Sequence, residues 1–393
     1  MRYFITTFLL FFALQIFSQG IEFFQGNLNE VFAKAKKENK FVFIDCYTTW
    51  CGPCKWLSAN VFTNKNVGEF HNTHFINYKL DMEKGEGKDF RTKYSVAAYP
   101  TLLYLNPEGQ VEHRALGAMD TLAFIKLSTN ALDTSNNIGS YIKKYNSGNR
   151  EPSFLASMAI ISNNAGLPFN IEEYFATQTD EQLNSEMNFR IIEMYNPDIS
   201  SREFKVLIEN RSDFYKTVGE YKTENRVRSM LLKTVYQKEK SLDTKNLEPY
   251  FIELLKPFNL KDAKELAWKA EMDYNKSRSA NWPRYLEIAD TLIKIHGDDA
   301  FSPDEWLNYC ENLIISNSQL PKLVETIEKN VGKGEKAETL YYKYYLIKGW
   351  LEYKKGNDYN SWSEQARKEA ALKGISDFQF ERILKQYFPA KKE

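Results

Sequence analysis

The chain has 393 residues, which favours two or three domains over one. Hydrophobic residues make up 43% and charged residues 26%, as in ordinary globular proteins, so a mostly disordered, collagenous or disulfide-scaffold chain is excluded. Lys and Arg number 52, as do Asp and Glu, and a formal charge of zero argues against nucleic-acid binding, which needs a basic face. Four cysteines are too few to build a fold, so each one is considered for its chemistry.

Residues 1–20 have the pattern of a secretory signal peptide. Arg2 supplies a positive start, residues 3–17 carry no charge, and the small residues at 18–20 suit cleavage. The apolar run is shorter than the roughly 20 residues of a membrane-spanning helix, although an uncleaved N-terminal anchor is the alternative. We therefore expect an exported protein, in a bacterial periplasm or, as the alternative, a eukaryotic secretory lumen, where disulfides persist.

Residues 21–133 mix helical and strand patterns, which predicts an α/β fold. Apolar residues at helical spacing begin at Leu28, and a lysine cluster follows that suits the end of a helix. A closing helix with Asp120 as its N-cap ends the region. The predicted elements after the first helix are strands at 41–44 and 75–80, a hairpin of strands at 101–105 and 111–115, and the closing helix at 121–132.

A polar stretch at 133–137 predicts a domain boundary, with a linker at 134–140. Beyond it, residues 141–393 show amphipathic helices with start signals such as Ser302, and almost no strand pattern. This predicts an all-α domain of one or two subdomains, built from stacked helical hairpins.

Part of this helical region loosely resembles a tetratricopeptide repeat through Gly349, Tyr353 and Gly356. The periodicity is too degenerate to establish a repeat. A stacked array of this kind would offer a concave surface to a protein partner.

The segment Trp50-Cys51-Gly52-Pro53-Cys54-Lys55 directly follows the predicted strand at 41–44 and opens a helix. A sulfur at the start of that helix would lie over unpaired N–H groups and the positive end of the helix dipole, which stabilise the nucleophilic thiolate. One turn further on, Cys54 could attack a mixed disulfide formed at Cys51. Pro53 costs little here, because the first turn has no intrahelical partner for its missing N–H.

A structural disulfide and half of a zinc site are the other interpretations of this pair. A zinc site would need a second pair of ligands, whereas the remaining cysteines are single and the one close histidine pair is His71 and His74. A bond between residues three apart closes a very small loop and adds little stability. We therefore favour a redox-active pair, with no metal and no other cofactor.

Together with Asp45, the segment Tyr99-Pro100-Thr101 and Gly117, the hexapeptide at 50–55 resembles a thioredoxin domain in order and spacing. The resemblance covers residues 21–133, and the hexapeptide is identical to the thioredoxin active site. The segment from Val61 onward is more similar to exported relatives, which include the terminal reducing domain of bacterial transmembrane thiol reductases. The fold implied is the thioredoxin fold, a central mixed sheet flanked by helices.

The resemblance also implies a role for each catalytic residue. Cys51 corresponds to the attacking thiol and Cys54 to the resolving thiol. Asp45 resembles the buried acid that handles the proton of the resolving thiol, and Lys79 the lysine that pairs with it. Pro100 resembles the cis-proline that faces the two sulfurs and whose backbone binds an extended substrate. The alternative for Asp45 is a turn residue at the end of a strand, and the buried acid is favoured because its offset from Cys51 fits the family.

Substrate contacts are implied for the residues beside the cysteines and the proline. Tyr99 departs from the family pattern, and Trp50 could alternatively be a core aromatic. The residues assigned to substrate binding are Trp50, Tyr99 and Thr101, and the residues assigned to supporting the site are Gly52, Pro53, Lys55 and Lys79.

The other two cysteines favour burial. Cys46 lies in the predicted strand, where a small buried residue is a simpler interpretation than a third redox thiol. Cys310 shares a helical face with Trp306 and Leu313, which predicts core packing. A bond between Cys46 and Cys310 would join the two regions, and the sequence leaves that possibility open.

These observations predict an exported thiol–disulfide oxidoreductase that reduces the disulfides of exported proteins. Because an oxidising compartment supplies no electrons, a membrane thiol donor is expected as its partner. Two alternatives stay open. One is a disulfide oxidase or isomerase, and the other is a helical protein-binding scaffold on which the thioredoxin-like domain only docks.

Overall fold

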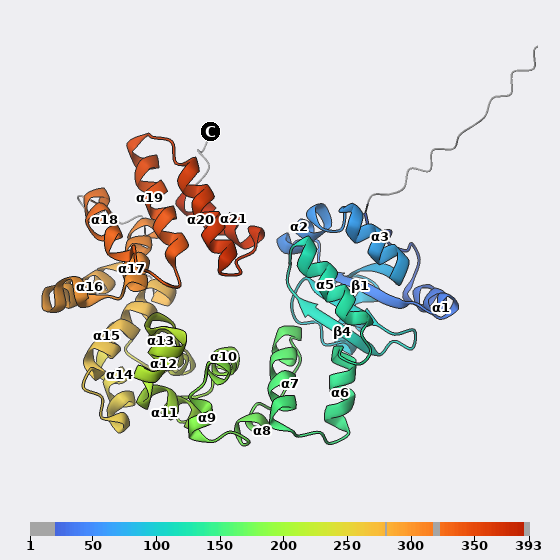
Figure 1. Ribbon diagram of the computed structural model, residues 1–393, viewed down its shortest axis with the longest axis horizontal. Coiled ribbons are helices and arrows are strands. Elements are labelled where there is room, and N and C mark those ends of the chain that lie inside the picture. The colour runs from blue at the N-terminus through green and yellow to red at the C-terminus, as the bar shows by residue number, and fades with distance from the viewer. Residues whose placement is uncertain (1–19, 280, 317–322, 389–393) are drawn as a thin grey trace, which may run out of the picture. The chain divides into compact units, whose positions relative to one another are not determined.

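The computed structural model describes residues 20–279, 281–316 and 323–388 (Figure 1). The chain divides into two compact units, between Asn149 and Arg150. The predicted signal peptide at 1–20 lies outside the described residues, apart from Gly20. Among the described residues, no helix is both long and apolar enough to span a bilayer.

The N-terminal unit is built on a four-stranded mixed sheet with the order β2-β1-β3-β4. β1 runs parallel to β2 and antiparallel to β3, and β3 forms a hairpin with β4. The predicted thioredoxin fold is confirmed by this sheet and its flanking helices. The strands are β1 (Phe41–Tyr47), β2 (Phe75–Asp81), β3 (Thr101–Leu105) and β4 (Val111–Leu116).

Helices cover both faces of the sheet. α1 and α4 contribute to the core on one face, and α2, α3 and α5 contribute to the core on the other. The predicted N-cap Asp120 accepts a hydrogen bond from the backbone of Ala123 at the start of α5. The helices are α1 (Leu28–Glu38), α2 (Gly52–Asn60), α3 (Lys65–His74), α4 (Gly87–Lys93) and α5 (Thr121–Leu132).

Alternation along β1 decides which side chains lie beneath which helix. Ile44 and Cys46 pack in the core with α1 and α4, whereas Phe43 packs in the core with α2, α3 and α5. Asp45 has the parity of Phe43. Its side chain therefore lies on the side of the sheet that α2 covers, and the side chain of Cys46 lies on the opposite side.

The compact unit extends beyond the linker expected at 134–140, because α6 (Ile138–Asn146) packs against β4. The buried carboxylate of Glu112 on β4 accepts a hydrogen bond from the Asn137 side chain at 3.0 Å. Asn137 in turn caps α6 by accepting from the backbone N–H of Ser140. These polar contacts attach α6 to the edge strand.

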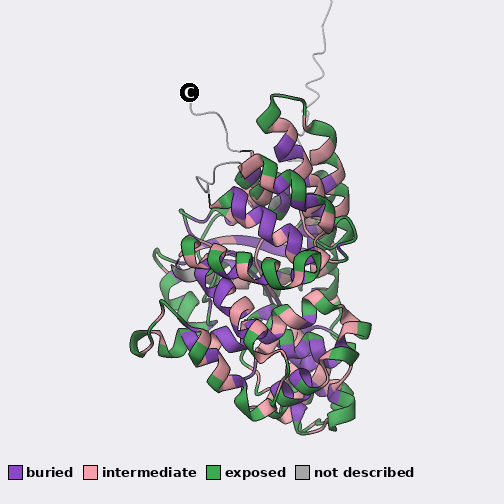
Figure 2. Cartoon of the chain, turned by 90° about the vertical axis from the view of Figure 1, so that its left-hand side faces the viewer, coloured by how far each residue is buried: buried purple, intermediate pink, exposed green. Residues whose placement is uncertain are grey.

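The C-terminal unit is all-α in its described residues, as expected. Figure 2 shows buried residues gathered along one side of many helices, the pattern that stacked amphipathic helices produce. The α-helices are α7 (Pro152–Ala165), α8 (Glu172–Phe175), α9 (Asp180–Leu183), α10 (Glu186–Tyr195), α11 (Arg202–Glu209), α12 (Arg211–Val218), α13 (Glu220–Lys238), α14 (Glu248–Leu255), α15 (Ala263–Tyr274), α16 (Trp282–His296), α17 (Pro303–Ile315), α18 (Leu323–Val331), α19 (Tyr341–Lys355), α20 (Asn360–Leu372) and α21 (Asp377–Tyr387).

A buried ionic cluster joins α13, α15 and α17 within this unit. The guanidinium of Arg228 is bonded to Asp273 at 2.7 Å and to Glu305 at 2.9 Å, and Arg228 is only 4% exposed. Lys276 and Lys269 give the two carboxylates one further cation each. Because burial removes water from these charges, losing one partner leaves the others poorly solvated.

We expect Arg228→Met to lower the free energy of unfolding of the helical unit by about 3 kcal/mol. This is the lower end of the range for breaking a buried ion pair, because each carboxylate keeps its lysine partner. Urea unfolding followed by far-UV circular dichroism measures this loss. The matched control is Lys216→Met, which removes an exposed pair with Asp213 and should cost at most about 1 kcal/mol. Equal losses in the two variants would contradict the structural role of Arg228.

Candidate redox site

Cys51 is the N-cap of α2, and its Sγ accepts a hydrogen bond from the backbone N–H of Cys54 at 3.1 Å. The helix starts at Gly52, and Pro53 occupies the first turn. The sulfur thus lies where the unpaired N–H groups of a helix start gather, as the sequence predicts. A thiolate at this position is stabilised by these donors and by the helix dipole.

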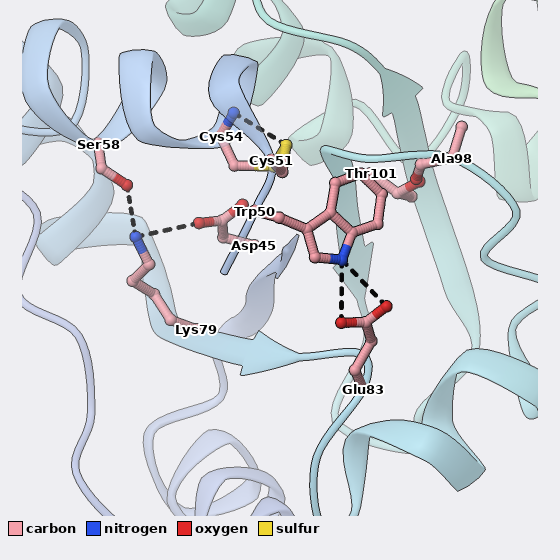
Figure 3. The surroundings of a disulfide bond; sticks show 9 residues. All are labelled: Asp45, Trp50, Cys51, Cys54, Ser58, Lys79, Glu83, Ala98 and Thr101. Carbon is pink, nitrogen blue, oxygen red and sulfur yellow. Dashed lines mark hydrogen bonds and ion pairs between the residues drawn. A yellow bond between two sulfur atoms is a disulfide. The ribbon is translucent and has the colours of Figure 1, made fainter. Parts of the chain in front are cut away.

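The two sulfurs form a disulfide, with Cα atoms of Cys51 and Cys54 5.3 Å apart (Figure 3). Both cysteines are 3% exposed. Gly52 and Lys55 beside them are exposed on the first turn of α2. Within the described part of the chain, no group of three or more His, Cys, Asp or Glu side chains is placed to hold a metal ion.

Asp45 is fully buried beneath α2, where it forms an ion pair with Lys79 (Figure 3). The two residues are register partners on β1 and β2, and Lys79 Nζ lies 3.2 Å from Asp45 Oδ2. Apart from that ion pair, no described residue donates a hydrogen bond to the carboxylate. Burial raises the pKa of Asp45 to about 6, and the Lys79 cation offsets part of that increase. Loss of hydration therefore outweighs the nearby charge.

The Tyr99–Pro100 peptide bond is cis, as the resemblance implies. The carbonyl of Pro100 already accepts a hydrogen bond from the N–H of Gly117 at 2.9 Å, and proline has no N–H. By contrast, no described residue hydrogen-bonds to the backbone N–H or C=O of Tyr99. In this loop the Pro100 carbonyl, expected to contact a substrate, thus has a partner within the chain, whereas the Tyr99 N–H and C=O have none among the described residues.

Thr101 does not face a substrate. Its side chain is fully buried, and its hydroxyl donates to the carbonyl of Ala98 at 2.8 Å. This bond closes the loop that contains Pro100. The assignment of Thr101 to substrate contact therefore changes to a role in holding the loop.

Trp50 is 65% exposed, which rules out a core position. Its indole N–H donates to both carboxylate oxygens of Glu83, at 3.0 and 3.1 Å (Figure 3). Its ring and the ring of Tyr99 are nearly perpendicular, with centroids 5.9 Å apart, and the guanidinium of Arg91 lies over Tyr99 at 5.8 Å. These contacts form an aromatic surface beside the disulfide.

Three residues of the site were missed from sequence: Ser58, Glu83 and Arg91. Ser58 accepts a hydrogen bond from Lys79 Nζ at 2.6 Å, and the other two contact Trp50 and Tyr99. Ser58 lies one helical turn after Cys54, a spacing that could have indicated it. Glu83 and Arg91 belong to no motif.

The other cysteines are buried and unpaired, so neither joins the redox site. Burial raises the pKa of the Cys46 thiol well above its ordinary value, and raises that of Cys310 to about 12. A thiol with a raised pKa carries little thiolate, and the thiolate is the reactive form. Cys46 also lies on the face of the sheet opposite α2.

His71, considered from sequence only in arguing against a zinc site, is a core residue. Its ring nitrogens contact Asn77 Oδ1 at 3.0 Å and Ser128 Oγ at 2.7 Å. Burial lowers the pKa of His71 to about 3, which keeps the ring neutral.

The raised pKa of Asp45 implies a pH-dependent cost to stability. The pKa of Asp45 rises on folding from 3.8 to about 6. The folded chain therefore loses stability as the pH increases through that interval, whereas at lower pH the acid is protonated in both states and costs no stability. We expect Asp45→Asn to raise the free energy of unfolding in mildly alkaline buffer by up to about 3 kcal/mol, since one pKa unit is about 1.4 kcal/mol.

Urea unfolding of the oxidised protein tests this, with hydrogen exchange of the β1 amides identifying the transition of this unit. The variant and the parent protein should converge at pH values below the ordinary pKa. Asp89→Asn, at an exposed position on α4, is the control and should change little. A stability difference that does not depend on pH would contradict the assigned cause.

Comparison with known proteins finds relatives of the N-terminal unit. Residues 24–107 match a family model described as thioredoxin-like. The chain is 32% identical over 103 residues to the thioredoxin H-type of Fagopyrum esculentum. This aligned stretch is 26% of this chain and 83% of that protein. A proposed disulphide-isomerase from Bacteroides thetaiotaomicron, solved in solution, is 46% identical and matches 29% of this chain and 94% of its own, with a TM-score of 0.28.

Longer relatives match over a small part of their length. The thiol:disulfide interchange protein DsbD of Pseudomonas fluorescens is 25% identical over 95 residues, which are 23% of this chain and 16% of that protein. The peptide-N(4)-(N-acetyl-beta-glucosaminyl)asparagine amidase of Caenorhabditis briggsae, 32% identical over 85 residues, is matched over 13% of its length. Since most of a plant thioredoxin is matched at 32% identity, the chain belongs, through its N-terminal unit, to the thioredoxin family of thiol–disulfide oxidoreductases.

Proposed function

We propose that the protein reduces disulfides in exported proteins, with Cys51 as the attacking thiol and Cys54 as the resolving thiol. The observation that carries this proposal is the position of the Cys51 sulfur at the start of α2, where it accepts a hydrogen bond from the Cys54 N–H. The same donors that hold the sulfur in the disulfide favour a thiolate after reduction.

In this reaction two electrons pass from the reduced cysteine pair to the substrate disulfide. The Cys51 thiolate attacks one substrate sulfur, forms a mixed disulfide and displaces the other substrate sulfur as a thiolate. Cys54 then gives up its proton, attacks Cys51 Sγ and displaces the second substrate thiolate. The products are a reduced substrate and the Cys51–Cys54 disulfide present in the structure.

Asp45 is the residue proposed to accept the proton of Cys54. It lies on the α2 side of the sheet, and it is the buried acid in register with Lys79. A base works best when its pKa is near the working pH, and the raised value of about 6 brings this carboxyl closer to neutrality than an ordinary aspartate.

The substrate is proposed to bind as an extended segment beside Pro100. The free N–H and C=O of Tyr99 allow a local strand addition, in which main-chain hydrogen bonds hold the segment across the two sulfurs. Trp50 and Tyr99 would then contact its side chains. Aromatic rings suit this task because they offer a large apolar surface with few rotatable bonds.

Export and the direction of electron flow are part of the proposal. The charge and length pattern of residues 1–20 supports export, most simply to a bacterial periplasm. Gly52 and Pro53 between the cysteines resemble the reducing members of the family. An oxidising compartment does not regenerate the reduced cysteine pair, so we propose a membrane-embedded thiol protein as electron donor. The similarity to a thiol:disulfide interchange protein supports a partner in such a pathway.

Trapping of partners tests the roles of the cysteines. In Cys54→Ala, the mixed disulfide at Cys51 cannot be resolved, so exported substrates and a membrane thiol protein should accumulate as covalent adducts, identifiable by mass spectrometry. Cys51→Ala should trap few or none. The matched control Cys46→Ala removes a buried thiol and should resemble the parent protein. Equal trapping by the two active-site variants would contradict the assigned roles.

The reduction potential tests the direction. Equilibration with glutathione buffers should give a reduction potential toward the reducing end of the family, about −270 mV. A value near about −120 mV, typical of strong oxidants, would reverse the direction and favour the oxidase alternative. Faster refolding of a scrambled substrate than reduction of insulin would favour an isomerase instead.

A further inference from the structure

The ammonium group of Lys79 is held from several sides on the α2 face of the sheet. Lys79 Nζ lies 3.2 Å from Asp45 Oδ2 and donates a hydrogen bond to Ser58 Oγ at 2.6 Å (Figure 3). Its side chain is 29% exposed. Three aromatic rings complete the surroundings, with centroids 5.3 to 5.4 Å from the nitrogen, and they belong to Phe23, Tyr47 and Phe62.

A groove of about 470 Å³ opens beside this ammonium. Ser58 and Lys79 contribute its polar lining together with Thr63, and Phe23 and Phe62 contribute much of its apolar lining. The groove offers the lysine an alternative to its ion pair, because an ammonium that moves into the groove regains water and avoids the cost of desolvation. Something must therefore keep the ammonium on the side of Asp45.

Ser58 is placed to do this. It lies on α2, four residues after Cys54, so the two side chains share a face of the helix. Its hydroxyl gives the ammonium a second fixed partner that comes from the helix rather than from the sheet. A donor proton that would otherwise point into the groove is satisfied within the protein.

We propose that Ser58 is a positioning residue, whose hydroxyl holds the Lys79 ammonium against Asp45 and so controls the protonation of the acid that serves Cys54. The catalytic part of this inference rests on the proposed function, whereas the effect on Asp45 does not. Without the hydroxyl, the ammonium should move toward water in the groove, and the carboxylate would lose part of its compensating charge.

The other groups that adjoin Asp45 on β1, β3 and α2 carry no positive charge, so Lys79 supplies the cation. Cys46 and Tyr47 adjoin it on β1, and both are neutral near pH 7, with pKa values raised first of all by burial. Its partner on β3 is Leu102, which does not titrate. α2 contributes the Cys51–Cys54 disulfide, which is uncharged. A change in the position of Lys79 should therefore appear directly in the titration of Asp45.

The test is a carboxyl ¹³C NMR titration of the oxidised full-length protein labelled at aspartate, with the Asp45 signal identified by its absence in Asp45→Asn. Lys79→Met should raise the pKa of Asp45 by roughly 1 to 3 pH units, the usual effect of losing an opposite charge at this distance. Ser58→Ala should raise it by a measurable fraction of that amount. Ser58→Thr keeps a hydroxyl and should restore the parent value.

The matched control is Thr63→Val, which removes another hydroxyl from the groove, one that donates to the carbonyl of Ala59 instead. It should leave the titration of Asp45 unchanged. A parent-like or lowered pKa in Ser58→Ala, or no change in Lys79→Met, would overturn the proposal. Because the titration uses no substrate, these outcomes are independent of whether the protein is a reductase.

The release of thionitrobenzoate from a mixed disulfide at Cys51 links the titration to the reaction. This release requires attack by Cys54, so its rate should increase with pH through the pKa of Asp45. In Ser58→Ala the increase should shift to higher pH in parallel with the NMR titration. A shifted titration with an unshifted rate profile would overturn the link to Cys54.

Discussion

The burial of Asp45 beneath α2 is the constraint on which the rest of the site depends. β1 is central in the sheet, and its alternation leaves one carboxyl on the side that carries the cysteines. A carboxylate without water is unfavourable there, so the structure around it is arranged to limit that cost. Lys79 comes from the neighbouring strand, and Ser58 comes from the helix above. Three aromatic rings surround the ammonium and limit its contact with water.

The loop that faces the disulfide is held by an equally specific set of polar contacts. Arg114 on β4 is buried, and its guanidinium donates to the carbonyls of Tyr94 and Ser95 at 2.8 and 2.9 Å. Thr101 closes the loop from the other end. Between these two ends, the N–H and C=O of Tyr99 have no hydrogen-bond partner among the described residues. The two halves of the site are therefore held by different contacts, one by an ion pair and the other by hydrogen bonds to main-chain carbonyls.

The sequence was most informative where contacts are local. The hexapeptide, the strand before it and the cap at Asp120 all depend on neighbours within a few residues, and each lies where the patterns predict. Glu83 and Arg91 were missed because their contacts to Trp50 and Tyr99 depend on how distant loops meet. Thr101 was misassigned because adjacency to Pro100 along the chain does not reveal which side of the loop a side chain faces. The contact of α6 with β4 was hidden in the same way, since a buried Glu112 has no sequence pattern that marks it.

On the proposed function, the buried acid is a compromise between stability and chemistry. A leucine or asparagine at position 45 would fill the same space without the cost of desolvating a charge. Such a residue could not accept the proton that the proposed reaction takes from Cys54. The ion pair with Lys79 reduces the cost without removing it, because a stronger pairing would lower the pKa of Asp45 and make it a poorer base. In the proposed reaction, the partial exposure of Lys79 would serve the same compromise, because a partly hydrated ammonium compensates the charge of Asp45 only in part.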